Sequence, residues 1–366
     1  MKIKKNDMVL LLSIINFLIF SLISYFISKL NNGIGTAPLV FSGDDGLMYH
    51  QVAVGEEFLD FELFWVKVIK FLYYISVQEP LVIRFFLILI FSFNLLYIAF
   101  YNSKNNVYNQ SPPKTGIKLI FLIFCFSPSF YLFYFFSIYR DALIAACFFF
   151  SSIYFYRRDL IFFTISLVLL FLLRPYMAGA LLLSFAIVFF IGVNKPARLL
   201  FILLLMFSIA VNVLIPVSNL LGFNLIDFRG GFSDSGANST FGINFNGSIL
   251  GNTISYWVSF ILNFFAGMPI FYNRPVYVFF FFAQSLPAII VFILVFSNKI
   301  AHSILERKML ITFLVWIMTY SLMNDNAGNS LRLFSAGLPI LLFVSARLCL
   351  YSGLEPPPKK GVIRKI

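Results

Sequence analysis

Charged residues are scarce in this sequence. Asp, Glu, Lys and Arg make up 11% of its 366 residues, whereas 60% are hydrophobic and 50 are Phe. This composition excludes a soluble domain of the same size. The apolar residues form repeated runs of about 20 residues and do not alternate with polar ones, which excludes a transmembrane β-barrel. The sequence therefore predicts an all-α polytopic membrane protein with about ten transmembrane helices, in one integral membrane domain over residues 1–366.

Residue types that often carry enzyme chemistry are also rare. The sequence has three cysteines, all within apolar runs where they are expected to pack as small apolar residues, and two histidines. It has no Walker A, G-x-S-x-G or H-E-x-x-H motif, so we expect neither a cofactor nor a metal. The net charge of +12 comes from Lys and Arg scattered between the apolar runs, so we expect no nucleic-acid partner.

The basic residues orient the predicted helices, because cytoplasmic loops are enriched in Lys and Arg. The N-terminal lysines and the basic tail, residues 352–366, place both termini in the cytoplasm. The outer loops are then expected at about residues 30–80, 218–275 and 324–332.

Two segments of these loops are expected to lie at the outer face without crossing the membrane. Within the first loop, charged residues recur at helical spacing around residues 56–74, which predicts an amphipathic helix in the interface. Residues 256–272 are apolar, and whether they span the membrane stays open. We prefer a re-entrant or interfacial segment broken at Gly267 and Pro269, because it keeps the basic residues that follow and the basic C-terminus in the cytoplasm.

Charges also interrupt the very apolar segment 127–174. At 1.5 Å per residue, Arg140 and Arg174 each lie about 25 Å from Arg157, whereas the hydrocarbon core is about 30 Å thick. If Arg157 sits at the cytoplasmic interface, both other arginines are recessed within the outer face. A charge at that depth usually faces a cavity or a partner.

The local setting of each charge suggests a role. Arg140 opposes the dipole of the helix expected to begin at Asp141, so we interpret it as aimed at an anion, whereas Asp141 could cap that helix. Arg174 ends a helix, where a snorkelling anchor and a fixed inward-facing arginine both stay open. Arg332 is expected to begin the last span and to need an anion nearby for the same reason as Arg140. Arg229 is a weaker candidate.

The motif GDDGLMYHQ, residues 43–51, clusters polar side chains in the first outer loop. Asp44, Asp45 and His50 are candidate catalytic residues, because a carboxylate or imidazole can act as a general base. Tyr49 is a candidate substrate-binding residue, since it shares a face with Asp45 if the segment is helical. A divalent metal site and a simple Gly-Asp-Asp-Gly turn are the alternatives.

Several short motifs resemble one family. They are Ser-Pro-Ser at 127–129 followed by Tyr139-Arg140-Asp141, then Leu173-Arg174-Pro175, and a late polar motif at 324–332. With the Phe-rich chain and its outer-face arginines, they resemble the O-antigen polymerases of bacterial surface-polysaccharide clusters. The resemblance implies transfer of a growing glycan from undecaprenyl diphosphate onto a lipid-linked repeat unit, at the periplasmic face of the bacterial inner membrane and without a nucleotide sugar.

The resemblance also implies partners and ligand-binding residues. The partners would be a lipid-linked oligosaccharide, the bilayer, and a chain-length regulator and flippase of the same pathway. The diphosphate would be held by Arg140, Arg174 and Arg332, with Asp141, Tyr49 and Arg229 also among the substrate-binding candidates.

Two other functions stay open. The acidic pair Asp44-Asp45 in the first outer loop is similar to that of GT-C-fold glycosyltransferases, which use polyprenyl-phosphate sugars. A transporter or flippase is the third alternative, although it would favour charges near mid-membrane over charges near one face.

Overall fold

The computed structural model describes most of the chain outside its termini and longest loops. The described residues are 15–16, 18–19, 22, 26, 34, 45–56, 63–76, 78–104, 115–129, 133–134, 138–193, 196–220, 240–245, 248–266, 268, 270, 273–297 and 304–351. They form helices almost throughout, and within them the only β-pairing is an isolated bridge between Thr240 and Asn326. The all-helical prediction is therefore confirmed for this part of the chain.

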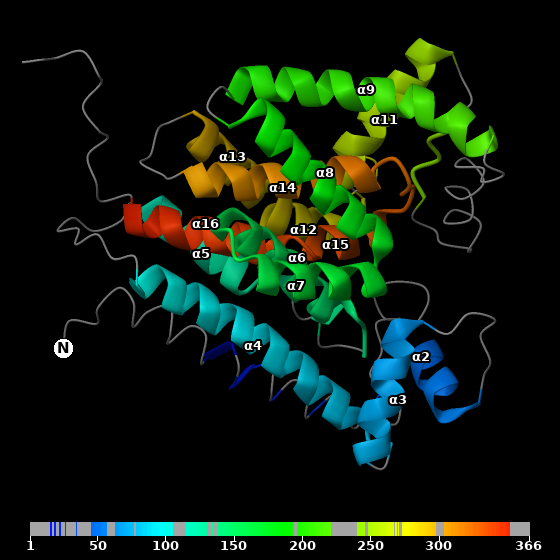
Figure 1. Cartoon of the computed structure of the whole chain (residues 1–366), viewed down its shortest axis with the longest axis vertical. Coiled ribbons are helices and arrows are strands. Elements are labelled where there is room, and N and C mark those ends of the chain that lie inside the picture. Colours follow the sequence, from blue (N-terminus) through cyan, green and yellow to red (C-terminus); the bar gives the residue numbers. More distant parts are fainter. Residues whose placement is uncertain are drawn as a thin grey trace, which may run out of the picture.

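The helices form a bundle in which α9 (Pro196–Leu220) and α4 (Pro80–Lys104) lie along opposite sides (Figure 1). The others lie between or beside them: α2 (Asp45–Val54), α3 (Phe64–Ser76), α5 (Thr115–Cys125), α6 (Asp141–Arg157), α7 (Leu160–Leu173), α8 (Pro175–Ile191), α11 (Ile249–Phe264), α12 (Pro275–Phe280), the π-helical turn η3 (Phe281–Ser285), α13 (Leu286–Phe296), α14 (Ile304–Tyr320), α15 (Ala327–Ser335) and α16 (Leu338–Tyr351).

The centre of the bundle is α14, which packs against α6, α8 and α16 among others. Its Trp316 is fully buried, and the indole N–H donates a 2.9 Å hydrogen bond to the carbonyl of Leu333. At Gly337, between α15 and α16, a Cβ atom would overlap the ring of Phe313 on α14. The bend between α15 and α16 therefore approaches α14 as closely as glycine permits.

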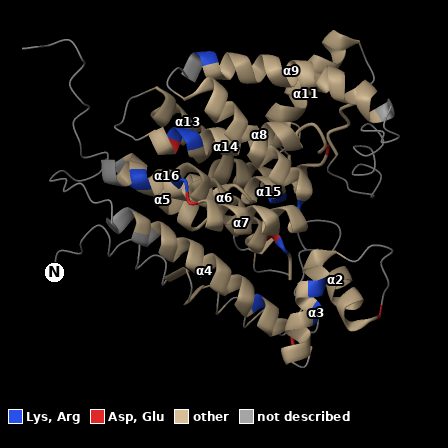
Figure 2. Cartoon of the chain, viewed as in Figure 1, with Lys and Arg blue, Asp and Glu red and all other residues tan. Residues whose placement is uncertain are grey.

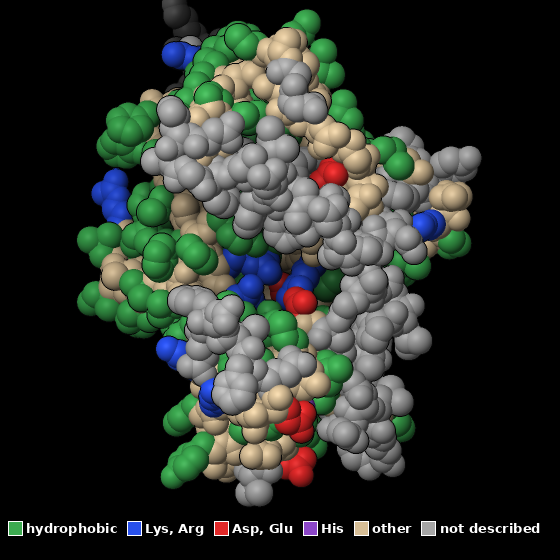
Figure 3. All heavy atoms as spheres, turned by 90° about the vertical axis from the view of Figure 1, so that its right-hand side faces the viewer, with side chains coloured by type: hydrophobic (Ala, Val, Ile, Leu, Met, Phe, Trp, Pro, Cys, Tyr) green, Lys and Arg blue, Asp and Glu red, His purple; other side chains and the backbone are tan. Residues whose placement is uncertain are grey.

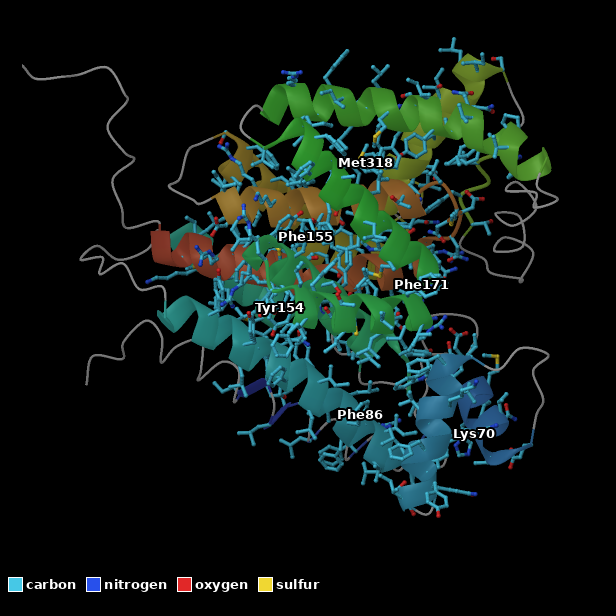
Figure 4. The ribbon with its side chains drawn as sticks, in the orientation of Figure 1. Lys70, Phe86, Tyr154, Phe155, Phe171 and Met318 are labelled. Carbon is cyan, nitrogen blue, oxygen red and sulfur yellow. The ribbon has the colours of Figure 1, made fainter. Side chains whose placement is uncertain are left out.

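Aromatic stacking accounts for much of the packing among the short helices. Phe155 of α6, which is labelled in Figure 4, stacks on Phe185 of α8 with ring centroids 3.7 Å apart. The ring of Phe163 on α7 lies 5.3 Å from Phe155. Such aromatic pairs add roughly 0.5–1.5 kcal/mol each beyond area burial. The richness in Phe thus fixes how α6, α7 and α8 lie against one another.

Within the described residues, three helices are long and apolar enough to cross a membrane: Pro80–Ile98, Arg198–Ser218 and Pro275–Phe296. The helices Ala327–Ser335 and Leu338–Cys349, bent by 51°, make a fourth if they count as one span. The prediction of about ten spans is therefore not confirmed. The reason is length: α5 and α7 have 11 and 14 residues, and 14 residues rise only about 21 Å.

The first predicted outer loop contains α2 and α3. Helix α3 buries Trp65, Ile69 and Tyr73 while Lys70 and Tyr74 on its other side are exposed, so it is amphipathic as expected. The Trp65 indole donates a 2.9 Å hydrogen bond to the carbonyl of Ile138, just before α6. This bond ties α3 to the segment that leads into Arg140 and Asp141.

Helix α11 occupies much of the segment predicted to be re-entrant or interfacial. It has 16 residues and ends at Phe264, before the expected break at Gly267 and Pro269, which lie outside the described residues. Its first residue, Ile249, is 76% exposed, whereas Ser259 near its end is fully buried and donates a 2.9 Å hydrogen bond to the carbonyl of Ser321. Helix α11 therefore runs from the surface into the bundle.

Candidate functional site

The site is built around Asp141, the first residue of α6. Its carboxylate is fully buried and accepts a 2.8 Å hydrogen bond from Nε of Arg332. Nη2 of Arg174 lies 3.7 Å from the other carboxylate oxygen. No side chain caps α6, so the capping role considered for Asp141 is wrong. Two charged guanidinium groups hold the carboxylate more strongly than neutral helix N–H groups would.

Arg332 approaches this carboxylate from α15. It lies in the last turn of that short helix and does not begin the last span, so its charge matches the helix dipole and the opposite expectation is wrong. Its guanidinium also forms an ion pair with Asp45 of α2 and lies 4.7 Å from the centre of the Tyr139 ring. Arg332 thus joins three segments that are far apart in the sequence.

Arg174 occupies the junction between α7 and α8. It follows the last residue of α7 and precedes Pro175, a favourable first residue for a helix because its missing N–H needs no partner there. Its side chain is buried, and its guanidinium lies 5.7 Å from the centre of the Tyr176 ring. Of the two interpretations left open by the sequence, the structure matches a fixed, inward-facing arginine.

Arg140 immediately precedes α6 and points toward the same junction. Its Nη1 donates a 2.9 Å hydrogen bond to the carbonyl of Leu173, the last residue of α7. The carbonyls at a helix C-terminus have no partner within the helix and carry partial negative charge, which suits a cation. This contact places Arg140 beside the residue that precedes Arg174.

Several N–H groups of these arginines have no hydrogen-bond partner among the described residues. They are Nε of Arg140, Nε and Nη1 of Arg174, and Nη2 of Arg332, and all of them are buried. Buried donors are normally paired, because leaving one unpaired costs about 1–3 kcal/mol. The cluster therefore has several unused donors for a ligand that carries several acceptor oxygens.

The charges in this group do not cancel. Three arginines face two aspartates, Asp45 and Asp141, which leaves one net positive charge. Arginine is suited to phosphate and carboxylate because its planar fork binds two oxygens at once. We call Asp45, Arg140, Asp141, Arg174 and Arg332 the arginine cluster.

Asp45 is the accessible member of the arginine cluster. It is the first residue of α2, and its side chain is 43% exposed, whereas that of Asp141 is fully buried. Burial alone would raise the pKa of Asp45, but the charge and hydrogen bond of Arg332, together with the charges of Arg140 and Arg174, hold that pKa below its usual value. Asp45 is therefore a carboxylate that three arginines keep ionised.

The arginine cluster lies at the end of the bundle where α6 and α8 begin and where α2 is found. In Figure 2, where the ribbon is coloured by residue type, the Lys, Arg, Asp and Glu positions lie mainly toward the two ends of the bundle. Figure 3 looks onto the right-hand side of Figure 1, the side of α2 and α3, and shows basic and acidic side chains meeting in a hollow near its centre. The site thus opens toward one end of the bundle.

The other residues of the predicted catalytic motif fall in different places. Tyr49 shares a face of α2 with Asp45, is buried, and lies close enough to Arg332 to interact with its charge. Nδ1 of His50 lies 2.7 Å from the hydroxyl of Tyr73 on α3. Asp44 and the substrate-binding candidate Arg229 lie outside the described residues.

His50 therefore belongs to the contact between α2 and α3. Burial lowers its pKa below the usual value of 6.5, and the opposing charge of Glu56 offsets this only in part. The structure thus gives no support to His50 as a catalytic residue, because its imidazole packs on Tyr73 while Asp45 faces the arginines.

Supporting residues that sequence reasoning did not assign hold α15 in place. Asn324 Nδ2 donates hydrogen bonds to Oδ1 of Asn263 at 2.6 Å and to Oγ of Ser330 at 2.9 Å. Asn326 caps α15 by accepting a 2.8 Å hydrogen bond from the N–H of Gly328. The available signal was the run of Asn and Ser at 324–330, which is typical of helix caps and turns.

No group of three or more His, Cys, Asp or Glu side chains that could hold a metal ion occurs within the described part of the chain. No protein-family model, curated protein or solved structure matches this chain. The arginine cluster is therefore the feature of the chain that bears on its function.

Proposed function

We propose that this protein is a membrane glycosyltransferase that polymerises undecaprenyl-diphosphate-linked oligosaccharide repeat units at the periplasmic face of the bacterial inner membrane. The observation that supports this proposal is the clustering of Arg140, Arg174 and Arg332 at one end of an apolar helix bundle, with four buried guanidinium nitrogens that have no hydrogen-bond partner among the described residues. A lipid-linked diphosphate carries its negative charge where lipid and water meet, and such a cluster would receive it.

The chemistry that this arrangement suits is displacement of a diphosphate. A hydroxyl oxygen of the acceptor glycan forms a bond to the anomeric carbon of the donor sugar, and the bond from that carbon to the phosphate oxygen breaks. The electron pair stays on the lipid diphosphate, which gains negative charge as it leaves. Fixed guanidinium groups in a site of low polarity stabilise such developing charge without having to reorganise.

The acceptor hydroxyl must also lose its proton. Asp45 is the carboxylate that lies at the arginines and remains reachable from solvent. A carboxylate within hydrogen-bond reach of the hydroxyl can take this proton, which typically contributes 10²–10⁴-fold in rate. We therefore assign the base to Asp45 and leave His50 out of the reaction.

A second function is favoured by the position of Asp45. An acidic residue in the first outer loop beside a phosphate-binding arginine also suits a GT-C-type glycosyltransferase, which would consume a polyprenyl-monophosphate sugar and add one residue. Both functions use the same cluster on a lipid-linked phosphate. They differ in the donor and in whether the product grows by whole repeat units.

The test is reconstitution of the full-length protein with each donor. With undecaprenyl-diphosphate-linked repeat units, the polymerase proposal expects a ladder of glycan lengths, and an Arg174→Ala variant at equal protein level should lose it. Transfer of one sugar from a polyprenyl monophosphate, with no ladder, would replace the polymerase by the GT-C function. Undiminished ladders from the Arg140→Ala and Arg174→Ala variants would remove the arginine cluster from the reaction.

In the cell, deletion of the gene should leave single repeat units on the surface lipid and abolish the long chains. The proposal places both termini in the cytoplasm and keeps a flippase and a chain-length regulator as functional partners. Cysteine labelling from the periplasmic side should reach Glu56→Cys near α2, and labelling only from the cytoplasm would reverse the orientation.

A further inference from the structure

The two ends of the Arg332 guanidinium differ in their hydrogen-bond partners. Its Nε donates to the buried carboxylate of Asp141 at 2.8 Å. At the other end, Nη1 donates to Asp45 while Nη2 is buried without a partner among the described residues. The Nη1–Nη2 end is one of the two edges through which a guanidinium binds two phosphate oxygens in parallel. In the structure a single carboxylate oxygen occupies it.

The two carboxylates that hold Arg332 differ in how firmly they are placed. Asp141 is fully buried at the start of α6, inside the bundle. Asp45 is 43% exposed at the first residue of α2, and α2 packs chiefly against α3. Asp45 is therefore the carboxylate that can move away from Arg332 with the smaller disturbance of the bundle.

We infer that Asp45 stands in for the substrate's phosphate: the diphosphate binds the Nη1–Nη2 end of Arg332 and displaces Asp45, whereas Asp141 stays in place. This inference rests on the proposed function and adds to it the Arg332 atoms to which the diphosphate binds.

The charge balance supports the exchange. With Asp45 in place the arginine cluster carries one net positive charge, and without it three arginines against Asp141 leave two. A diphosphate that joins a sugar to a lipid has one ionised oxygen on each phosphate, which makes two negative charges. Departure of Asp45 therefore matches the cluster to the ligand and frees the carboxylate near the acceptor.

An internal competitor weakens binding of the external ligand by the free energy of its own contact. A partly exposed charged pair contributes up to about 1 kcal/mol, and the upper part of that range corresponds to roughly a 2- to 5-fold change in Kd. Asp45→Asn should therefore bind diphosphate about 2- to 5-fold more tightly than the unchanged protein while turning over more slowly, because the amide cannot serve as a base. A residue that merely helped to hold the substrate would give weaker binding.

The matched control is Glu56→Gln. Glu56 is an exposed carboxylate just beyond the C-terminal end of α2, and its charge acts on His50. The same change from carboxylate to amide there alters the net charge equally, so it should leave the Kd within about twofold if the effect is specific to the contact with Arg332.

The experiment uses full-length protein in nanodiscs of zwitterionic lipid, with inorganic pyrophosphate and undecaprenyl diphosphate as separate probes. Tighter binding of both probes by Asp45→Asn and by Asp45→Ala, with helix content unchanged by circular dichroism, supports the exchange. Unchanged or weaker binding by both variants overturns it. Tighter binding of pyrophosphate alone also overturns it, because the lipid-linked diphosphate then does not bind at the Nη1–Nη2 end of Arg332.

Failure of the proposed function looks different in the same experiment. If unchanged protein and an Arg332→Gln variant bind neither probe, the arginine cluster is not a diphosphate site. If unchanged protein binds both probes and Arg332→Gln binds neither, but Asp45→Asn has no effect on the Kd, the proposed function stands and the exchange alone is wrong.

Discussion

The two ion pairs that Arg332 forms, with Asp45 and with Asp141, allow a direct test of how the arginine cluster is stabilised. Asp45 and Asp141 both pair with Arg332, but their side chains are 43% and 0% exposed. Changing either to Asn removes the same charge with almost no change in shape. The two variants therefore differ mainly in the burial of the ion pair that they break.

The expected costs differ several-fold. A solvent-exposed pair contributes about 0.2–1 kcal/mol, so Asp45→Asn should have a small effect on the free energy of unfolding. Breaking a buried pair by removing one partner costs about 3–5 kcal/mol, because the remaining charge is left uncompensated. Asp141→Asn leaves two such charges, since Arg174 and Arg332 both face that carboxylate. Its effect should therefore lie at the upper end of that range.

The assay is thermal unfolding in detergent followed by intrinsic tryptophan fluorescence, which Trp316 in the core makes sensitive to the bundle. The fall in Tm for Asp141→Asn should be several times that for Asp45→Asn. In an Arg332→Gln background the effect of Asp141→Asn should shrink, as expected for residues in direct contact. Equal shifts for the two aspartate variants would refute the assignment of Asp141 as the buried counter-ion of the cluster.

Three further predictions follow from single contacts. Arg174→Lys keeps the charge but loses the planar fork, so the rate should fall roughly ten- to hundredfold in the reconstituted assay, and a rate equal to that of the unchanged protein would contradict the bidentate role. Burial lowers the pKa of His50, so the unfolded chain binds its proton more readily, and the Tm should be highest above pH 6.5 and fall as the pH drops below that value. His50→Gln removes the titrating group and should flatten this profile in a thermal unfolding series. Gly337→Ala would push a methyl group into the ring of Phe313 and should cost about 1–3 kcal/mol in unfolding free energy, whereas Gly179→Ala on α8, where nothing lies within 4 Å of the added Cβ, should be tolerated.

The arginines were predictable because a charge within a long apolar run stands out without any structure. Arg140 and Arg174 were found from their distance to Arg157, and the structure brings both to one end of the bundle. What the sequence could not show is the pairing between Asp141 and Arg332, which are 191 residues apart. Helix-end rules suggested a cap for Asp141, and a long-range ion pair replaced it.

The predicted number of spans is not confirmed, for a related reason. Hydropathy reports whether a run is apolar but not where its helix ends. Helix α5 stops at Cys125, just before Ser127-Pro128, and α15 and α16 meet at a 51° bend near Gly337. That bend is also why Arg332 ends a short helix and does not open a long one. Breaks set by local backbone chemistry decide both the span count and the position of this arginine.

The balance of charge in the arginine cluster bears on which lipid donor it suits. Three arginines without counter-ions, of which Arg174 is buried and Arg140 and Arg332 are half-buried, would be costly to fold, and Asp141 offsets one of the three charges permanently. If Asp45 yields its place, two positive charges remain for the ligand. A diphosphate diester supplies two negative charges and gains another as it leaves, whereas a monophosphate diester supplies one and would leave part of the cluster uncompensated. The composition of the cluster therefore favours the diphosphate donor of a polymerase over the monophosphate donor of a GT-C enzyme.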